Sequence, residues 1–313
     1  MLVKEVLDVG GDIAPLIIPE GREGGLMNPS IYNDNGKLLC NLRHVKYTIY
    51  HNRKHPHTYG PLQYIHREDD RTLRTVNYIV ELSDDLKIIS SHKVDTSKLD
   101  VTPLWEFIGL EDARLFRWNG VLCLCGVRRD TTTNGQGRME ISELGKNFEE
   151  VYRRRIPAPG NNDSYCEKNW MPILDQPHKF VKWTNPTEIV DTSGIETSSV
   201  VKDNYRHTDR DLRGSSQAIP YKGKYIAFLH ECALYKTELL AKDAVYLHRI
   251  VVWDKEWNIE YLSEPFSFTG APIEFCTGLA EYKDHFLVTF GVQDNAAFIL
   301  KIPARKFQEL CNF

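Results

Sequence analysis

A hairpin signal that recurs five times most constrains the fold of this chain. Five short runs rich in β-branched and aromatic residues each follow a turn, and the turn residues are Gly36, Gly120, Pro177, Gly223 and Asp284. A second short segment precedes each turn: "NPSIY", "GLEDARLF", "NWMPIL", "SSQAIP" and "CTGLAEY". Two apolar runs separated by a tight turn indicate a β-hairpin, so the chain predicts five of them.

Further strand candidates follow some of the hairpins, at 75–82, 246–254 and 296–303. Hairpins of this kind in a loose repeat predict an all-β fold, a five-bladed β-propeller with four-stranded blades that spans 1–313 as one domain. A pair of β-sandwiches and an α/β fold are the alternatives. Helix candidates are few, a C-terminal helix at about 303–313 and a second segment at 231–243, and no glycine-rich nucleotide loop precedes a helix. The propeller is therefore preferred.

The composition is that of an ordinary globular protein, with 42% hydrophobic and 26% charged residues. The net charge of −4 gives no indication that the protein binds nucleic acid or an anionic membrane. The basic stretches "RRD" and "YRRRIP" nevertheless leave open that the acceptor is a nucleic acid. The scattered cysteines lie mostly in apolar runs and are expected to be reduced. The first residues include acids and do not form a signal peptide, and no apolar run is long enough for a membrane span. We expect a cytoplasmic protein, and leave open whether it is a homo-oligomer.

Ionisable and hydrogen-bonding residues gather where the predicted inner strands begin and where the second strands end. The innermost strands of a propeller line a central channel, so these residues should converge from all blades. A channel with a purely structural role would not need so many ionisable groups. Acids, bases and hydrogen-bond donors that converge in a concave site are typical of an active site. The candidates are Asn28, Arg43, Glu111, Asp112, Arg114, Arg128, Lys168, Asn169, Arg213, His230, Glu231, Glu274 and Asp294.

The second segment, "GLEDARLF", places two carboxylates beside an arginine. Side chains alternate along a strand, so Asp112 is expected to face the channel and Glu111 to turn away into a supporting pairing. Arg114 should share the face of Asp112 and either bind substrate or set the pKa of that carboxyl. Taken alone, the cluster also fits a simple ion pair with Arg114. The repeat favours Asp112 as a general acid/base, which requires a partly desolvated carboxyl.

No metal site or resident cofactor is predicted. Cys123 and Cys125 would share one face of a strand, but no second pair stands at zinc spacing. The histidine-rich stretch 51–57 matches no standard metal spacing and is interpreted as a polar loop. Phosphate or an activated sugar is expected only as a co-substrate.

The ordered motifs "NPS", "GLEDARLF", "EKNWMP", "RGSSQAIP…IAFLHE" and "FGVQDNAAF" span about 28 to 298. Their succession resembles the five-bladed propeller enzymes of glycoside hydrolase family 130, which are β-mannoside phosphorylases and hydrolases with related glycosyltransferases. The resemblance implies that Asp112 is the proton donor of the family's Glu-Asp-Pro-Arg motif, with Ala113 in place of the proline. It implies sugar-hydroxyl binding by Asn28, Arg43 and Asp294, and a place for His230 near the phosphate or leaving group.

The mechanism implied by the resemblance is a single displacement that inverts the anomeric carbon, and in the phosphorylases the donor acts through a substrate hydroxyl. This chain reads "TNP" at 184–186 where the phosphorylases have a basic "HRP". The uncharged Asn185 would hold phosphate poorly, so either Lys168, Arg213 and Arg128 compensate or free phosphate is not used. A hydrolase would need a carboxylate to activate water, for which Glu167, Glu231 and Glu274 are candidates.

The sequence thus predicts a carbohydrate-active enzyme that transfers a glycosyl unit with inversion, as a glycosyltransferase or glycoside phosphorylase acting on a sugar, sugar phosphate or nucleotide sugar. An inverting hydrolase of β-mannosides or similar glycosides is the first alternative. A non-catalytic propeller that binds a glycan or a protein partner is the competing class.

Overall fold

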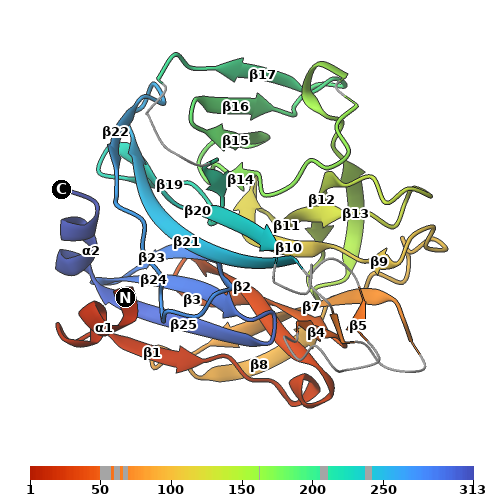
Figure 1. The fold of residues 1–313 in the computed structure, drawn as a ribbon, viewed down its shortest axis with the longest axis horizontal. Coiled ribbons are helices and arrows are strands. Elements are labelled where there is room, and N and C mark those ends of the chain that lie inside the picture. Colours follow the sequence, from red (N-terminus) through yellow and green to blue (C-terminus); the bar gives the residue numbers. More distant parts are fainter. Residues whose placement is uncertain (50–57, 60–63, 66–69, 162, 205–210, 237–241) are drawn as a thin grey trace.

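The computed structural model describes residues 1–49, 58–59, 64–65, 70–161, 163–204, 211–236 and 242–313. The histidine-rich stretch 51–57 lies outside them. Antiparallel sheets are arranged around a common centre, with the chain passing from one to the next in sequence order (Figure 1). The predicted all-β, five-bladed propeller is confirmed.

Each blade has four strand positions, filled from the centre outward. Blade 1 contains β2 (Gly25–Asp34), β3 (Lys37–Val45), β7 (Leu73–Leu82) and β8 (Ile88–Lys93). Blade 2 contains β10 (Glu111–Trp118), β11 (Val121–Arg128), β12 (Arg138–Leu144) and β13 (Glu150–Arg155). Blade 3 contains β14 (Met171–Pro172), β15 (Lys179–Thr184), β16 (Thr187–Asp191) and β17 (Ser198–Val201).

In blade 4, two short strands share the innermost position, and both pair with the next strand outward. Its strands are β18 (Arg213–Gly214), β19 (Ile219–Tyr221), β20 (Lys224–Lys236), β21 (Lys242–Trp253) and β22 (Ile259–Leu262). Blade 5 contains β23 (Glu274–Tyr282), β24 (His285–Val292), β25 (Ala296–Pro303) and β1 (Asp12–Pro15). Trp183 of β15 pairs with Arg213 of β18, which joins blades 3 and 4 into one continuous sheet.

Short elements complete the chain. They are β4 (Thr48–Ile49), β5 (Thr58–Tyr59), β6 (Tyr64–Ile65), β9 (Phe107–Ile108), α1 (Leu2–Leu7), α2 (Ala304–Leu310) and the 3₁₀ turns Pro19–Glu23 and Pro159–Asn161. The predicted C-terminal helix is present as α2, whereas α1 was not predicted. Over the ranges that the structure describes, no helix has the length and apolar character needed to cross a membrane.

The five predicted hairpins are confirmed, and the turn residues explain them. Three of the turns, Asn35-Gly36, Asn119-Gly120 and Lys222-Gly223, have two consecutive residues with positive φ. This is the backbone of a two-residue type I′ turn, whose twist matches that of the strands it connects. Glycine adopts this conformation without a steric penalty, so the sequence signal has a direct physical cause.

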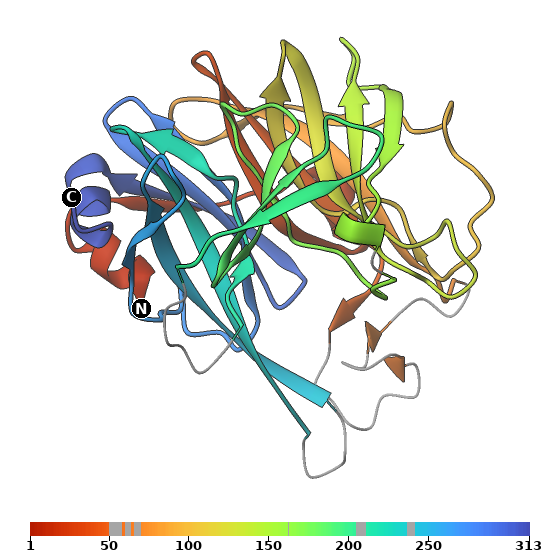
Figure 2. The same ribbon diagram turned by 90° about the horizontal axis from the view of Figure 1, so that it is seen from above.

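The helix candidate at 231–243 is wrong, because its described residues lie in β20 and β21. These strands remain paired from Tyr225–Trp253 to Lys236–Lys242, so the ladder hydrogen bonds override the local pattern. Figure 2 shows this hairpin extending beyond the other blades.

The ring is closed by the N-terminal segment, which the sequence did not predict. β1 adds to the outer edge of blade 5 and pairs with β25 from Asp12–Lys301 to Pro15–Phe298. The last blade therefore combines strands from both ends of the chain. Closure of this kind holds the first and last blades together through main-chain hydrogen bonds.

Five hydrophobic cores lie between neighbouring blades. Between blades 4 and 5, for example, the stacked rings of Phe268 and Phe290 are both fully buried, with centroids 4.3 Å apart. Between blades 2 and 3, Trp118 contacts Phe180 edge to face. Each blade contributes side chains to the cores on both of its sides, so the blades depend on one another for burial.

Gln217 links four blades at the centre of the ring. It is fully buried between β18 and β19 of blade 4. Its Nε2 donates to Ser30 Oγ and Ile31 O in blade 1 and to Leu115 O in blade 2, at 3.1, 3.0 and 2.7 Å. Its Oε1 accepts the Leu279 N–H of blade 5 at 3.0 Å. One side chain thus satisfies main-chain groups of three other inner strands.

We predict that Gln217→Leu lowers the free energy of unfolding by about 3 kcal/mol or more, because several buried main-chain groups lose their partner and each costs about 1–3 kcal/mol. Urea unfolding followed by tryptophan fluorescence measures this. Gln176→Leu, which removes one partly exposed hydrogen bond to Tyr225, is the matched control and should cost about 1 kcal/mol or less. Equal losses in the two variants would contradict the central role of Gln217.

Candidate active site

The inner strands of several blades are interrupted at the same level of the ring. The pairing register shifts between Met27 and Ser30 in β2, between Glu111 and Arg114 in β10, and between Cys276 and Gly278 in β23. A β-bulge of this kind adds a residue to one strand and redirects its side chain, and bulges are frequent beside active sites.

Four polar residues, two of them within these interruptions, have left-handed backbones. They are Asn28 (φ 43°), Asp112 (φ 50°), Asn169 (φ 62°) and Asp294 (φ 48°). Asparagine and aspartate tolerate this conformation better than other side chains, although at a cost that clusters at functional sites. Gly126 makes room for one bulge, since a Cβ there would lie 2.2 Å from Glu111 O.

The redirected side chains line one cavity of about 130 Å³. The predicted residues that lie around it are Asn28, Arg43, Glu111, Asp112, Lys168, Asn169, Arg213, His230 and Asp294. Aromatic and aliphatic side chains complete the wall: Tyr47, Phe107, Tyr246, Ile273 and Phe275. All five blades or their connections contribute to it.

Asp112 is held by one carboxylate oxygen. Asn28 Nδ2 and Arg43 Nη1 both donate to its Oδ1 at 2.7 Å. Oδ2 accepts no hydrogen bond from a residue that the structure describes. Burial raises the pKa of Asp112, but Arg43 and the hydrogen bond from Asn28 outweigh it and bring the pKa below its usual value. The carboxylate is therefore ionised at neutral pH, with one oxygen available to a ligand.

Arg43 organises the carboxylates of the cavity. Its Nε donates to Thr75 Oγ1 at 3.0 Å and its Nη2 to Tyr47 OH at 2.6 Å, which leaves Nη1 for Asp112. Glu111 Oε2 lies 3.6 Å from Nη2. A buried guanidinium fixed on three sides presents a preorganised positive charge to the cavity.

Glu111 does not turn away from Asp112 as strand alternation predicted. Both residues line the cavity, because the bulge between Glu111 and Arg114 breaks the two-residue period. Burial raises the pKa of Glu111 and Arg43 partly offsets this. Its Oε1 is buried without a hydrogen-bond partner among the described residues.

Arg114 lies beneath the cavity rather than in its wall. It is 1% exposed, and it donates to Ser215 O and to Asp112 O at 2.7 Å each. The bond to Ser215 connects blade 2 to blade 4. Arg114 thus fixes the backbone of Asp112 and also lowers the pKa of its carboxyl.

His230 closes the opposite side of the cavity. Its Nδ1 lies 3.1 Å from Ser215 Oγ, and its ring stacks on Tyr246 and meets Phe275 edge on. Burial, together with His248 and nearby cations, places the pKa of His230 well below its usual value, so the imidazole is neutral. His248 lies deeper, with a pKa lowered by burial to about 3, and its Nε2 accepts the Cys276 N–H.

The remaining predicted residues lie outside this cavity. Arg128 pairs with Glu140 and Asp130 between blades 1 and 2, and Glu231 pairs with Arg249. Glu274 is fully buried and accepts hydrogen bonds from the N–H groups of 268, 269 and 271. Glu167 bonds Ser164 and Trp170. The structure therefore gives each of these residues a partner away from Asp112.

The basic stretches also have partners. Arg153 pairs with Glu150, Arg154 donates to Thr192, and Arg155 pairs with Glu140. Among the described residues, no group of three or more His, Cys, Asp or Glu side chains is placed to hold a metal ion. All seven cysteines are free thiols.

The sequence did not single out the aromatic wall. Tyr47 follows Arg43 by four residues, and Phe275 is adjacent to Glu274, so both lie next to predicted positions. Tyr246 lies in the "YLHRI" run beside His248. The convergence of polar residues predicts where the site lies, but it does not indicate which apolar residues face the cavity.

The fold resembles that of known carbohydrate-active enzymes. MPT-4, a mannose phosphorylase from Leishmania mexicana in complex with phosphate, has a TM-score of 0.57 and 13% identity over 99% of this chain and 94% of its own. A β-1,2-mannobiose phosphorylase from Listeria innocua, bound to β-1,2-mannobiose, has a TM-score of 0.57 and 13% identity over 96% of both chains.

A third structure comes from the GH130 family of mannoside phosphorylases, which is described as containing glycoside hydrolases that target β-1,2-mannosidic linkages in Candida mannan. It has a TM-score of 0.62 and 12% identity over 90% of this chain and 85% of its own. No protein-family model and no curated protein matches the chain at a significant level. At these identities the likeness shows the fold, and it extends over nearly the full length.

Asp294 provides a pH test of the cavity. Burial raises its pKa to about 6, with Arg43 opposing and the neighbouring carboxylates adding to the shift. A raised pKa in the folded state stabilises the protein below the unfolded pKa, and this contribution is lost as the pH rises through about 6. We predict that Asp294→Asn is about 2–3 kcal/mol more stable than the wild type at about pH 8, and that the gain declines from about pH 6 and approaches zero only below about pH 4.

Urea unfolding at several pH values measures this difference. Asp203→Asn, which removes an exposed carboxylate, is the control. A constant difference in stability between the Asp294 variant and the wild type across this range would contradict the raised pKa of the buried carboxyl.

Proposed function

We propose that the protein transfers a glycosyl unit with inversion, as a glycoside phosphorylase or glycosyltransferase, with Asp112 as the general acid/base. The observation that carries the proposal is the state of Asp112: an ionised carboxylate, fixed through one oxygen by Arg43 and Asn28, whose second oxygen is free. A positioned base with an open acceptor is what proton transfer from a sugar hydroxyl requires. The likeness to mannoside phosphorylases supports the same chemistry.

In the synthetic direction, Asp112 accepts a proton from a substrate hydroxyl, directly or relayed through a second hydroxyl. The acceptor oxygen forms its bond to the anomeric carbon as the bond to the phosphate oxygen breaks on the opposite face. Phosphate, or a nucleoside phosphate, leaves with the electron pair, and the configuration inverts. In the reverse direction phosphate attacks, and the protonated Asp112 returns its proton to the leaving hydroxyl.

The cavity offers positive charge for the phosphate. Lys168 and Arg213 line it, and Lys168 has no ion-pair partner among the described residues. Arg213 is 40% exposed, and among the described residues its ion-pair partner is the exposed Asp211 at 3.5 Å. Both cations remain available to an anion, and they supply the charge that Asn185 lacks. Arg128, the third residue expected to compensate, is committed to Glu140.

Inverting hydrolysis is the second candidate, and Asp294 is the observation that favours it. A second carboxyl in the same cavity, with a pKa of about 6, could activate water opposite Asp112. The water-activating candidates Glu167, Glu231 and Glu274 do not line the cavity, so this role falls to Asp294 or Glu111. The competing hypothesis is a propeller that binds a glycan or a protein without catalysis. It predicts that binding does not depend on the charge of Asp112.

We predict that Asp112→Asn reduces turnover by about 10²–10⁴-fold, because the amide keeps the shape and loses the proton acceptor. The assay follows release of phosphate from sugar 1-phosphates, of nucleotide from nucleotide sugars, and of sugar from β-mannosides with and without phosphate, and so separates transferase, phosphorylase and hydrolase. Asp85→Asn, an exposed change in blade 1, is the control. The enzymatic proposal would be refuted if the protein turned over none of these substrate classes and both variants bound glycan like the wild type.

We also predict that Lys168→Met raises the KM for the phosphate-bearing substrate by about tenfold or more and leaves the affinity for a neutral acceptor sugar nearly unchanged, because one charge-assisted contact is lost. Initial-rate measurements with each substrate varied in turn show the split. Lys202→Met, away from the cavity, is the control. An equal effect of Lys168→Met on both substrates would argue against a phosphate contact.

A further inference from the structure

A second cavity, of about 270 Å³, lies directly beside the candidate active site. Its walls come from the segment that leads into β14, from the end of β15 and from β18, so it lies where blades 3 and 4 join. Lys168, Asn169 and Arg213 line both this cavity and the cavity that contains Asp112. These three residues therefore form a shared wall, and we call the second cavity the side cavity.

The pairing of three strands places Trp183 in line with the candidate active site. Trp183 of β15 is directly opposite Arg213 of β18, and Arg213 is directly opposite His230 of β20. Residues directly opposite each other in antiparallel strands share one face of the sheet, with Cβ atoms about 5 Å apart. Trp183, Arg213 and His230 thus form a row that leads from the candidate active site into the side cavity.

Trp183 offers a ring surface to a ligand. It lines the side cavity and is 37% exposed, more than any other tryptophan of the chain. An indole ring in the wall of a cavity presents a flat apolar face on which another planar ring can stack. Nucleobases stack on such rings whatever their sequence identity, because every base has a π-face.

The shared wall carries positive charge that the described part of the chain leaves largely unpaired. Lys168 forms no ion pair with a described residue, and Arg213 has the exposed Asp211 at 3.5 Å. The third cation of the side cavity, Lys182, is paired with Glu167 at 3.7 Å. Unpaired cations at the wall between two cavities favour a phosphate group that both cavities can reach.

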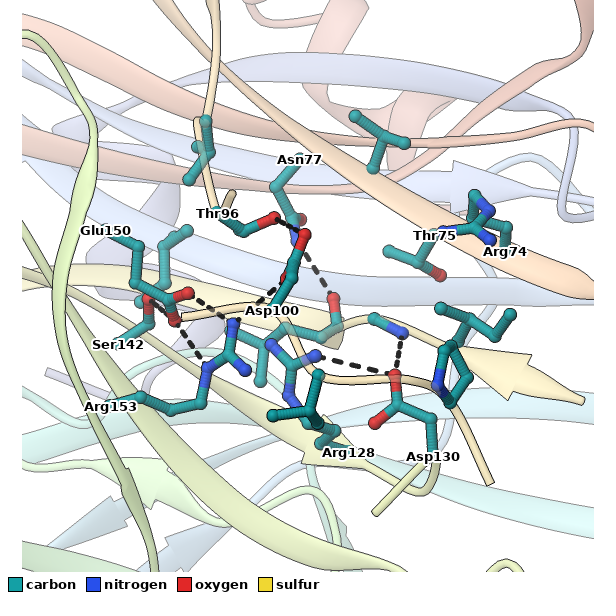
Figure 3. Close-up of a pocket in the computed structure, with 18 of the residues that line it drawn as sticks. Arg74, Thr75, Asn77, Thr96, Asp100, Arg128, Asp130, Ser142, Glu150 and Arg153 are labelled. Carbon is teal, nitrogen blue, oxygen red and sulfur yellow. Dashed lines mark hydrogen bonds and ion pairs between the residues drawn. The ribbon is translucent and has the colours of Figure 1, made fainter. Parts of the chain in front are cut away.

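Charged side chains in the larger cavity between blades 1 and 2 pair with one another, in contrast to Lys168 (Figure 3). Arg153 bonds both carboxylate oxygens of Glu150, and Arg128 lies 3.5 Å from Asp130. Those charges neutralise one another and fix the shape of that cavity. Lys168 has no carboxylate of this kind among the described residues, so its charge remains available to a ligand.

Asn169 adds an unsatisfied acceptor to the shared wall. The residue is 8% exposed, and its Oδ1 is buried without a hydrogen-bond partner among the described residues. A buried amide oxygen without a donor costs free energy, so a ligand hydroxyl at this position would stabilise the complex. The wall between the two cavities therefore offers both cations and a hydrogen-bond acceptor.

We infer that the side cavity binds the nucleoside of a nucleoside diphosphate sugar, with the base stacked on Trp183 and the diphosphate at Lys168 and Arg213. A hydroxyl of the same molecule donates to Asn169 Oδ1. The inference rests on the proposed function in one respect, that these two cations hold the leaving phosphate. Inorganic phosphate ends at the cations, whereas a nucleoside diphosphate continues past them into the side cavity.

The corresponding reaction is a single displacement at the anomeric carbon. The acceptor oxygen bonds to this carbon, and the bond from the carbon to the β-phosphate oxygen breaks. The nucleoside diphosphate leaves with the electron pair, and Asp112 takes the proton of the acceptor hydroxyl. Because the displacement inverts the carbon, the acceptor approaches from the side opposite Lys168, and the side cavity stays free for the leaving group.

The test is isothermal titration of the full-length protein with GDP, UDP and ADP, and with pyrophosphate, inorganic phosphate and neutral β-1,2-mannobiose as further probes. At least one nucleoside diphosphate should bind about tenfold more tightly than pyrophosphate, because stacking adds to the charge contacts. Trp183→Ala should remove this advantage and leave the affinity for pyrophosphate unchanged, and Trp183→Phe should retain most of it. Lys168→Met should weaken both ligands.

Tyr152→Ala is the matched control, because it removes an exposed aromatic ring that lines neither cavity. It should bind every probe like the wild type. The inference is overturned if no nucleoside diphosphate binds more tightly than pyrophosphate, or if Trp183→Ala weakens both equally or neither. A loss confined to mannobiose in Trp183→Ala would also overturn it, since the ring would then hold a neutral sugar.

Turnover separates this inference from the proposed function. Phosphate release from mannose 1-phosphate that depends on Asp112, together with any of the contrary binding results, would overturn the inference and support the proposed function. Nucleoside diphosphate binding that depends on Trp183, without any turnover that depends on Asp112, would support the side cavity as a nucleotide site and refute the proposed reaction. Because Trp183 is exposed, its variants test the inference in a folded protein.

Discussion

The buried amide of Gln217 is the interaction on which the centre of this propeller depends. Inner strands that converge on an axis cannot pair with one another as sheets do, so their main-chain groups need other partners. Gln217 supplies two donors and an acceptor to blades 1, 2 and 5 from blade 4. Ser30 extends the network by accepting the Leu115 N–H at 2.9 Å. Satisfied in this way, the axis is polar and yet fully buried at Gln217 and Ser30.

The candidate site lies where that regular pairing stops. The bulges in β2 and β10 bring Asn28 and Asp112 together across two blades, and the left-handed backbones at both residues are part of that redirection. Strain at these positions is held by the surrounding hydrogen bonds, including Arg114 to Asp112 O. The same departure from sheet geometry thus shapes the cavity and orients the Asp112 carboxylate.

Turn chemistry and polar convergence made much of this predictable from the sequence. The Asn-Gly and Lys-Gly turns marked the hairpins, and their repeat placed Asp112, Arg43 and Asp294 near one axis. The direction of Glu111 was not predictable, because a bulge reverses the alternation that strand reasoning assumes. Glu231 and Glu274 have the same local pattern as the residues of the cavity, and only tertiary partners such as Arg249 distinguish them. The pairing of β1 with β25 is also non-local and has no sequence signal.

The pairing of β1 with β25 has a consequence for how this protein is made. Asp112 emerges in the first half of the chain, but Asp294 and the strand that receives β1 emerge near its end. A ribosome-bound chain therefore carries Asp112 before it has Asp294 or the strand that receives β1. The cavity is therefore complete only after the last blade has been made and β1 has paired with β25.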